Sequence, residues 1–389
     1  MSAARGVAIG GAVTLLVVTA LLVRLTAAWV PLQPRESAAG GARAADVTVA
    51  SGQPLGTMRV ELAGLESTVW YPAADDASGA RARYPLTLRM DPALPEVTLG
   101  TTRGAAVLDA PWAATATPAP LVLLSPGFAL PPSAYSWLGE ALAAGGRVVI
   151  APDHGETLDP AGLAAATVAR PRELTAVLDA VEALASPGGP WHGRVDSSAV
   201  DVMGHSYGGY AAQAMGGARL DTRELRERCA AGRTADHPGV FLCDALEPHL
   251  REIAADAGLA EVPADLWPSW RDERVVSVVS LAGDAAMFGD AGLAHLNVPV
   301  LAVGGDADRD SPVDWGVELT AAAAGAPATL HLLEGAGHMD LLDSVDVVRP
   351  LATLLPGGFV ERSPAIRRAF HAEVLDAVAA HLRPSETPA

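Results

Sequence analysis

Six short apolar runs, separated by longer helical patterns, occupy the chain from Leu121 onward. They read LVLLSPGF, RVVIAPDHGET, AVDVMGHSYGG, RVVSVVSLAGD, VPVLAVGGDAD and ATLHLLEGAGH. Strands that are apolar along their whole length are covered on both faces, and strands that alternate with helices are typical of parallel sheets. The sequence therefore predicts an α/β fold with a mainly parallel central sheet and helices on both faces. In such sheets ligands bind beyond the carboxyl ends of the strands.

The third run ends at a serine enclosed by glycines. Gly204-His205-Ser206-Tyr207-Gly208 fits the pattern G-x-S-x-G, and an alanine-rich helical segment follows it. In a nucleophile elbow the serine occupies a strained turn from strand to helix, so its neighbours must be small. The helix that follows directs its first N–H groups at the reaction centre. We interpret Ser206 as a nucleophile; a glycine-serine loop without a chemical role is the alternative.

A serine nucleophile needs two partners, which the later strand ends supply. A histidine accepts the hydroxyl proton, and a carboxylate orients that histidine. After an elbow, the acid is expected next in the chain and the histidine last. His338, in the glycine-flanked loop of LLEGAGHMDLL, is the predicted base. Asp308, in LAVGGDADRDSP, is the predicted acid, with Asp306 as its nearest rival.

The same strand ends offer groups that can contact the reacting ester. An oxyanion needs preorganised N–H donors, which we assign to Tyr207, directly after the serine, and to Phe128 in SPGFAL. Gly127 allows a close approach there, although ordinary core packing of Phe128 is the alternative. His154 in APDHGET and His205 are expected either to line the substrate pocket or to be structural, and not to be catalytic.

The N-terminus differs from the rest of the chain. Gly6–Val23 is an uncharged apolar run of 18 residues. At about 1.5 Å per residue it spans roughly 27 Å, enough for a bilayer. Residues 1–30 are therefore predicted to be an uncleaved membrane anchor, with a cleaved signal peptide as the alternative. A linker over 31–50 and a hydrolase domain over 51–383 follow, and either prediction places the domain outside the cytoplasm. Two strand-like runs in MRVELAGLESTVWYPA, near the start of this domain, predict an antiparallel pair.

An insertion interrupts the alternation between Gly217 and Glu273. It contains RELRERCAAG, ALEPHLREIAADAGL and PADLWPSW, which we predict to be helices joined by proline-rich turns. The insertion could form a cap over the site, or it could have no role in function; the sequence leaves both interpretations open. Cys229 and Cys243 flank a short loop-like segment, which a disulfide could close in an exported protein; two free buried thiols are the alternative.

Charge and ligand chemistry limit the classes of molecule that we expect this chain to bind. The formal net charge is −18 and the sequence has no basic cluster, which argues against a nucleic-acid partner. The chemistry outlined above requires no cofactor, and no second pair of ligands accompanies the cysteines to form a metal site. We expect a small-molecule or lipid ester as substrate and membrane contact only through the N-terminal segment. The sequence leaves the oligomeric state open.

Over roughly Leu55–Arg383 these motifs resemble the α/β-hydrolase superfamily. STVWYPA, PLVLLSPGF, VVIAPDHGET and MGHSYGG are similar to the platelet-activating-factor acetylhydrolase and dienelactone-hydrolase-like group. VPVLAVGGDADRDSP and LEGAGHMDLL support the same placement. The resemblance implies the following roles: Ser206 as nucleophile, Asp308 as acid, His338 as base, and Phe128 and Tyr207 as oxyanion donors.

The core is also similar to bacterial cutinases that cleave polyesters. The likeness lies in GRVDSSAVDVMGHSYGG and in the Asp-x-x-x-Pro of Asp308 to Pro312. Those enzymes usually have a tryptophan at the end of the sixth strand, where this chain has SLAGDAAMFG, and an open cleft, where this chain has its insertion. Dienelactone hydrolases proper use a cysteine nucleophile, so Ser206 argues against that specific reaction.

Together these features predict a serine hydrolase that cleaves carboxylic esters through an acyl-enzyme. A lipase, a phospholipid acyl hydrolase or a polyesterase acting on larger substrates is the alternative within enzymes. From a different class, the domain could be an inactive hydrolase fold that serves as an extracellular binding module. That alternative predicts a damaged set of site residues, whereas the sequence contains a serine, an aspartate and a histidine in the expected order.

Overall fold

The part of the chain that the computed structural model describes comprises residues 53–90, 95–159, 161–343 and 364–382. The predicted anchor over 1–30 and the predicted linker over 31–50 lie outside these residues. Within the described ranges, none of the helices has both the length and the apolar character that a bilayer crossing requires.

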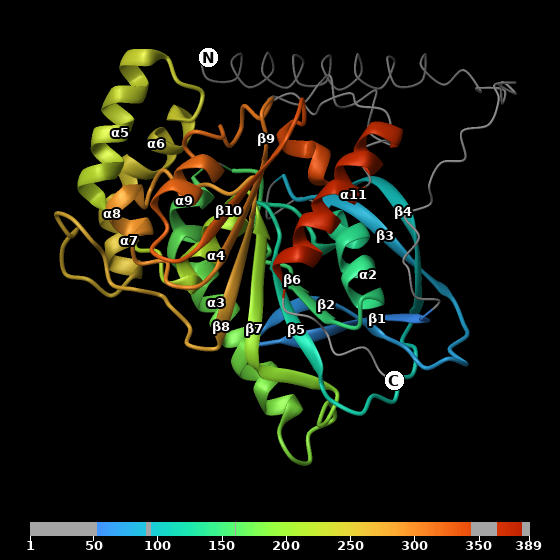
Figure 1. The fold of residues 1–389 in the computed structure, drawn as a ribbon. Helices are drawn as coiled ribbons and strands as arrows, with labels where there is room; N and C mark the ends of the chain where they lie inside the picture. The colour runs from blue at the N-terminus through green and yellow to red at the C-terminus, as the bar shows by residue number, and fades with distance from the viewer. Residues whose placement is uncertain (1–52, 91–94, 160, 344–363, 383–389) are drawn as a thin grey trace, which may run out of the picture. The chain divides into compact units, whose positions relative to one another are not determined.

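The described residues contain a sheet of ten strands in the order β10-β9-β8-β7-β5-β6-β2-β1-β4-β3 (Figure 1). From β10 to β6 every neighbouring pair is parallel. These six strands are β5 (Ala119–Ser125), β6 (Val148–Pro152), β7 (Val195–His205), β8 (Val275–Leu281), β9 (Val300–Gly305) and β10 (Ala328–Leu333). Each coincides with one of the apolar runs, so the predicted parallel sheet is confirmed.

Four strands precede this parallel part in the chain. They are β1 (Leu55–Leu62), β2 (Leu65–Pro72), β3 (Arg81–Leu88) and β4 (Val97–Leu108). The predicted antiparallel pair is formed by β1 and β2, and β2 joins it to the edge of β6. We predicted no element over β3 and β4. The signal was present, because the side chains of RARYPLTL in β3 alternate between more exposed and buried positions, the pattern of a strand with one face on the core.

Helices cover both faces of the sheet, as predicted. One face packs against α2 (Ser136–Ala144) and α11 (Pro364–His381), and the other against α3 (Gly162–Ala185), α4 (Tyr207–Gly216) and α9 (Val317–Ala323) (Figure 1). Strand β5 shows the reason for its continuous apolar run. Leu121 and Leu123 lie in one core, Val122 and Leu124 lie in the other, and all four are fully buried.

The insertion between β7 and β8 is helical in its first two thirds. It forms α5 (Thr222–Ala235), α6 (Val240–Leu246), the short 3-10 helix η2 (Glu247–His249) and α7 (Leu250–Asp256). The predicted helix over PADLWPSW is wrong, because this segment is not helical. Its two prolines, Pro263 and Pro268, disfavour a helix. Trp267 is buried there instead, and its indole donates a hydrogen bond to Thr222 Oγ1 at 2.7 Å.

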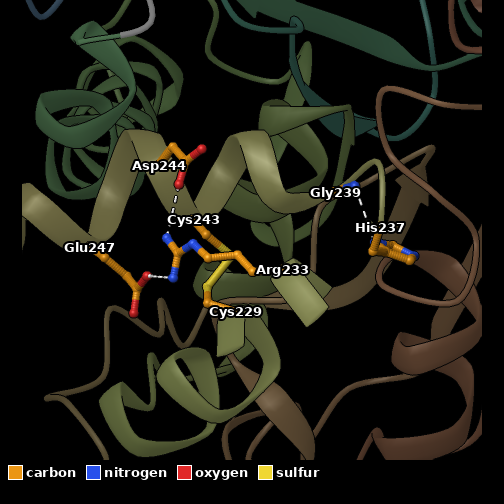
Figure 2. The surroundings of a disulfide bond; sticks show 7 residues. All are labelled: Cys229, Arg233, His237, Gly239, Cys243, Asp244 and Glu247. Carbon is orange, nitrogen blue, oxygen red and sulfur yellow. Dashed lines mark hydrogen bonds and ion pairs between the residues drawn. A yellow bond between two sulfur atoms is a disulfide. The ribbon is translucent and has the colours of Figure 1, made fainter. Parts of the chain in front are cut away.

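Cys229 on α5 and Cys243 on α6 form a disulfide (Figure 2). Beside it, Arg233 on α5 donates to Asp244 Oδ1 at 2.9 Å and pairs with Glu247 at 2.7 Å. The Arg233 side chain is 44% exposed, so these ion pairs contribute little to stability. The disulfide is therefore the stronger tie between the two helices.

Removing this disulfide should destabilise the insertion. The Cys229→Ser/Cys243→Ser variant is expected to lose about 3 kcal/mol of unfolding free energy. The reason is that a closed loop of this length lowers the conformational entropy of the unfolded chain, which stabilises the folded state by that amount. Urea unfolding with and without dithiothreitol measures the effect. Reductant should shift the midpoint of the natural chain and leave that of the double variant unchanged. Equal midpoints for the natural chain with and without reductant would contradict the prediction.

Candidate active site

Ser206 lies at the junction of β7 and α4, with φ 56° and ψ −123°. This backbone conformation is strained for any residue with a side chain. The flanking glycines allow it sterically. A Cβ on Gly204 would lie 2.1 Å from the carbonyl oxygen of Gly208, and one on Gly208 would lie 2.1 Å from that of Ser125. The G-x-S-x-G pattern is thus a packing requirement of this turn.

The Gly208→Ala variant should therefore fold poorly. Its methyl group meets rigid backbone, so we expect a loss of about 3 kcal/mol or more of unfolding free energy. Gly145→Ala is the control, because its added Cβ would lie 3.3 Å from the nearest atom, the carbonyl oxygen of Leu142. Chemical denaturation of both variants measures the difference. If Gly208→Ala is as stable as Gly145→Ala, the tight packing of the turn is refuted.

Asp308 and His338 meet beyond the ends of β9 and β10. His338 Nδ1 lies 2.7 Å from Asp308 Oδ2, and the two side chains are 6% and 1% exposed. The other carboxylate oxygen, Oδ1, accepts hydrogen bonds from the backbone N–H groups of Asp310 at 2.9 Å and Ser311 at 2.8 Å. Both oxygens of Asp308 are thereby fixed. This geometry leaves Nε2 of His338 as the nitrogen that can exchange a proton with a substrate or a nucleophile.

Asp306 occupies a different position from Asp308. Its Oδ1 accepts a hydrogen bond from the backbone N–H of Gly335 at 2.5 Å, and the residue is exposed. Asp306 therefore braces the loop that carries His338 from outside. Of the two predicted candidates for the acid, the structure brings Asp308 to the histidine.

The imidazole of His338 lies next to the elbow. Its ring centroid is 4.6 Å from that of His205, the residue before Ser206. Burial alone would lower the pKa of His338, but the charge of Asp308 and its hydrogen bond outweigh burial and raise this pKa to about 9. The Asp308 carboxylate therefore favours the protonated imidazole of His338.

This pKa sets the expected pH dependence of activity. Only the neutral imidazole can accept a proton from a serine hydroxyl. We therefore expect kcat/KM for a short ester to be low at pH 6 and to rise as the pH approaches the pKa of His338, about 9. Initial rates between pH 5.5 and 10, in buffers of constant ionic strength, test this. A flat profile between pH 5 and 8 would exclude His338 as the base.

The loop after β5 carries the predicted oxyanion donor Phe128. Its preceding residue, Gly127, donates its N–H to the hydroxyl of Tyr135 at 2.9 Å. Its following residue, Ala129, has φ 56° and donates its N–H to Glu156 Oε2 at 2.9 Å. Among the described residues the N–H of Phe128 itself donates to no protein acceptor. The loop is thus held on both sides of an available N–H group.

The two predicted oxyanion residues are neighbours in space. The rings of Phe128 and Tyr207 pack edge to face, with their centroids 6.2 Å apart. The Tyr207 hydroxyl lies 2.5 Å from Thr167 Oγ1 and donates to Leu163 O at 3.1 Å, so its side chain is fixed against α3. Tyr207 begins α4, where backbone N–H groups have no intrahelical acceptor. The ring contact therefore places the Phe128 loop beside the elbow.

A buried arginine that sequence reasoning missed holds the Phe128 loop from below. Arg170 on α3 is 1% exposed and donates to the carbonyl oxygens of Pro126 at 2.6 Å and Gly127 at 3.1 Å. It also pairs with Glu156 through bonds of 2.7 and 2.5 Å. Burial would raise the pKa of Glu156, but the charge of Arg170 lowers it overall. No local motif in ARPREL distinguishes this arginine from a surface residue.

Of the two possibilities for His154 and His205, the structure favours the structural one. His154 Nε2 lies 3.0 Å from Ser125 Oγ, its Nδ1 lies 2.6 Å from Glu173 Oε2, and its side chain is 3% exposed. His205 is fully buried, with Nδ1 2.9 Å from the Tyr135 hydroxyl. Both imidazoles are enclosed by protein and have protein partners.

Comparison with known proteins relates part of this chain to polyester hydrolases. A family model described as PET hydrolase-like matches residues 94–226, about a third of the chain. Cutinase est1 of Thermobifida alba is 40% identical over 88 residues, which make up 23% of this chain and 27% of that protein. Bis(hydroxyethyl) terephthalate hydrolase of Streptomyces coelicolor is 40% identical over 88 residues, 23% of this chain and 25% of that protein. This chain thus matches about a quarter of the length of these curated relatives.

A solved structure extends the comparison to most of the chain. The structure of a ferulic acid esterase from Streptomyces cinnamoneus aligns with a TM-score of 0.51 and 22% identity, covering 87% of this chain and 95% of that one. At this identity the likeness establishes the fold alone. The predicted α/β-hydrolase fold and the predicted similarity to polyester-cleaving cutinases are both confirmed.

Proposed function

We propose that this chain, which has the α/β-hydrolase fold, is a serine hydrolase that cleaves carboxylic esters. The observation that carries the proposal is the strained Ser206 turn beside a buried Asp308–His338 pair. The names of its similar proteins, which are cutinases and a terephthalate ester hydrolase, support ester chemistry. A binding module has no need of a strained serine and an oriented imidazole, so the geometry favours the enzyme.

In the proposed reaction Ser206 Oγ attacks the ester carbonyl while His338 Nε2 accepts its proton. Asp308 holds His338 Nδ1 and stabilises the imidazolium that forms. The N–H groups of Phe128 and Tyr207 bind the oxyanion of the tetrahedral intermediate. His338 then protonates the leaving alcohol, which yields an acyl-enzyme. Water, deprotonated by His338, attacks this acyl-enzyme and releases the acid and Ser206.

A polyesterase is the second candidate, and one specific observation favours it. The PET hydrolase-like match covers both the Phe128 loop and the Ser206 elbow. Against it, the chain carries the insertion over residues 217–273. We propose that small esters are the main substrates. Polymers and lipids are the alternative substrates.

We further propose that the insertion forms one wall of the site. A small cleft beside the Asp308 loop is lined by Phe241 and Leu242 of α6 together with Asp310, Ser311 and Trp315. Phe241 is 45% exposed. The indole of Trp315 also packs closely against α5, which fixes the insertion to the loop that carries the acid.

For location we propose an exported domain over 51–383, held to a membrane by the N-terminal segment or released from it. The Cys229–Cys243 disulfide supports export, because structural disulfides persist in oxidising compartments. Fractionation of cells that produce the full chain, followed by N-terminal sequencing of the product, tests anchor against cleaved signal. A product that stays in the cytoplasm would contradict both.

A covalent probe gives the most direct test of the proposed reaction. The full chain, purified in detergent, is treated with a fluorophosphonate and digested, and we expect the mass adduct on the peptide that contains Ser206. The Ser206→Ala variant is the control. Rates are then measured with p-nitrophenyl acetate, butyrate and palmitate, and with a polyester film. Short esters should react fastest; a faster reaction with palmitate or film favours the lipase or polyesterase. A folded protein that neither labels nor turns over any ester would support the binding module instead.

A further inference from the structure

A buried carboxylate that the proposed mechanism does not use lies beside the elbow. Asp284 follows β8, the strand between β7, which leads to Ser206, and β9, which leads to Asp308. It is 8% exposed. The N–H of Asp284 donates to the carbonyl oxygen of Ser206 at 3.4 Å, and the carbonyl oxygen of Asp284 accepts a hydrogen bond from Gln213 Nε2 at 3.3 Å. The backbone of Asp284 is thus attached to the turn that carries the nucleophile.

One residue joins the carboxylates of Asp284 and Asp308. Ser311 Oγ donates to Asp284 Oδ1 at 2.8 Å, and Ser311 N donates to Asp308 Oδ1 at 2.8 Å. Ser311 is only 5% exposed, so neither bond is shared with bulk water. Because Asp308 in turn orients His338, a continuous chain of hydrogen bonds runs from Asp284 to the imidazole.

The charges around this chain of hydrogen bonds are mostly negative. The charges of Asp308, Asp310 and Asp284 all raise the pKa of His338. The ring of His205 also faces the imidazole. Burial lowers the pKa of His205 well below 6.5, so this neighbour is neutral. Burial raises the pKa of Asp284 to about 6, which leaves the group ionised in the alkaline range where His338 loses its proton. The imidazolium is therefore the one cation among these groups.

We propose that Asp284 is a positioning residue of the site, which holds the backbone of Ser311, and through it Asp308, against His338 and adds a further negative charge that stabilises the imidazolium. A buried carboxylate is costly unless it is paired or hydrogen-bonded, and the donor to the Asp284 carboxylate, Ser311 Oγ, lies on the loop that carries Asp308. The effect on catalysis rests on the proposed function, whereas the effect on the imidazole does not depend on turnover.

Three variants separate charge from hydrogen bonding. Asp284→Asn keeps an acceptor for the Ser311 hydroxyl and removes the charge. Ser311→Ala removes the hydroxyl that donates to Asp284 and keeps the backbone N–H that donates to Asp308. Asp314→Asn is the control, because Asp314 is on the same segment, has a side chain that is 56% exposed, and pairs with His237 instead. The pKa of His338 is measured by NMR titration of its ring in each full-length protein, with the signal assigned by His338→Gln.

Asp284→Asn should lower the pKa of His338 by about one unit, and the acid limb of the kcat/KM profile should move with it. Ser311→Ala keeps the backbone N–H that donates to Asp308 but frees that backbone from Asp284, so Asp308 should be held less rigidly and kcat should fall by about 10- to 100-fold with little change in KM. Asp314→Asn should leave both unchanged. A His338 pKa in Asp284→Asn equal to that of the natural chain overturns the proposal. If the natural chain turns over no ester, the proposed function fails, while the NMR titration still decides the role of Asp284.

Discussion

Replacing Ser206 by alanine should lower kcat for a p-nitrophenyl ester by about a million-fold, and removing His338 as well should cost almost nothing more. The two side chains act as one unit, since the imidazole has no proton to accept without the hydroxyl. The measurement is kcat for Ser206→Ala, for His338→Ala and for the double variant, each divided by the concentration of folded protein. The residual rate reports the oxyanion donors and substrate binding alone.

The control for this series is His192→Ala. His192 is exposed, and its Nδ1 lies 3.2 Å from the carbonyl oxygen of Ala185, away from the site. Its loss should leave kcat unchanged. Losses that multiply in the double variant, or a Ser206→Ala variant that keeps the activity of the natural chain, would show that the two residues do not form one catalytic unit.

Replacing Arg170 by methionine should destabilise the fold by about 3–5 kcal/mol at neutral pH. The substitution leaves the carboxylate of Glu156, whose side chain is 14% exposed, without its cationic partner. It also removes the donors that hold the carbonyl oxygens of Pro126 and Gly127, so the loop that presents Phe128 should loosen and kcat should fall. Urea unfolding and ester kinetics on the same preparation measure both effects.

Two further variants isolate the cause. Arg170→Met/Glu156→Gln should recover part of the lost stability, because a neutral amide costs less to bury than an unpaired charge. Arg233→Met breaks two ion pairs of an arginine whose side chain is 44% exposed, and it should leave the free energy of unfolding nearly unchanged. If Arg170→Met is no more destabilising than Arg233→Met, the buried pair does not have the structural role assigned to it.

The sequence by itself determined the parallel sheet and the order of the site residues along it. Apolar runs such as LVLLSPGF form strands because both of their faces are buried, which is a property of local composition. The elbow at Ser206 could likewise be predicted from the sequence, because the small residues that the turn requires all lie within the five positions 204–208. Parallel strands place their carboxyl ends on one edge, and the strand pattern alone therefore predicts that Ser206, Asp308 and His338 lie in one region.

Other features were readable in part. The strand pattern of β3 was present in the sequence but was not recognised. The segment PADLWPSW was assigned to a helix although its prolines disfavour one. In both segments the local sequence carries the signal: alternating exposure in β3, and two prolines in PADLWPSW.

Only the tertiary structure decided which polar side chains face one another. Asp306 and Asp308 share a loop, and the fold turns one to Gly335 and the other to His338. His154 and His205 stand at strand ends, yet they are enclosed by partners from distant segments. Arg170 and Asp284 carry no local signal, because their partners lie 14 and 27 positions away in the chain. Burial and pairing of such groups depend on contacts that form only when the strands and helices pack together.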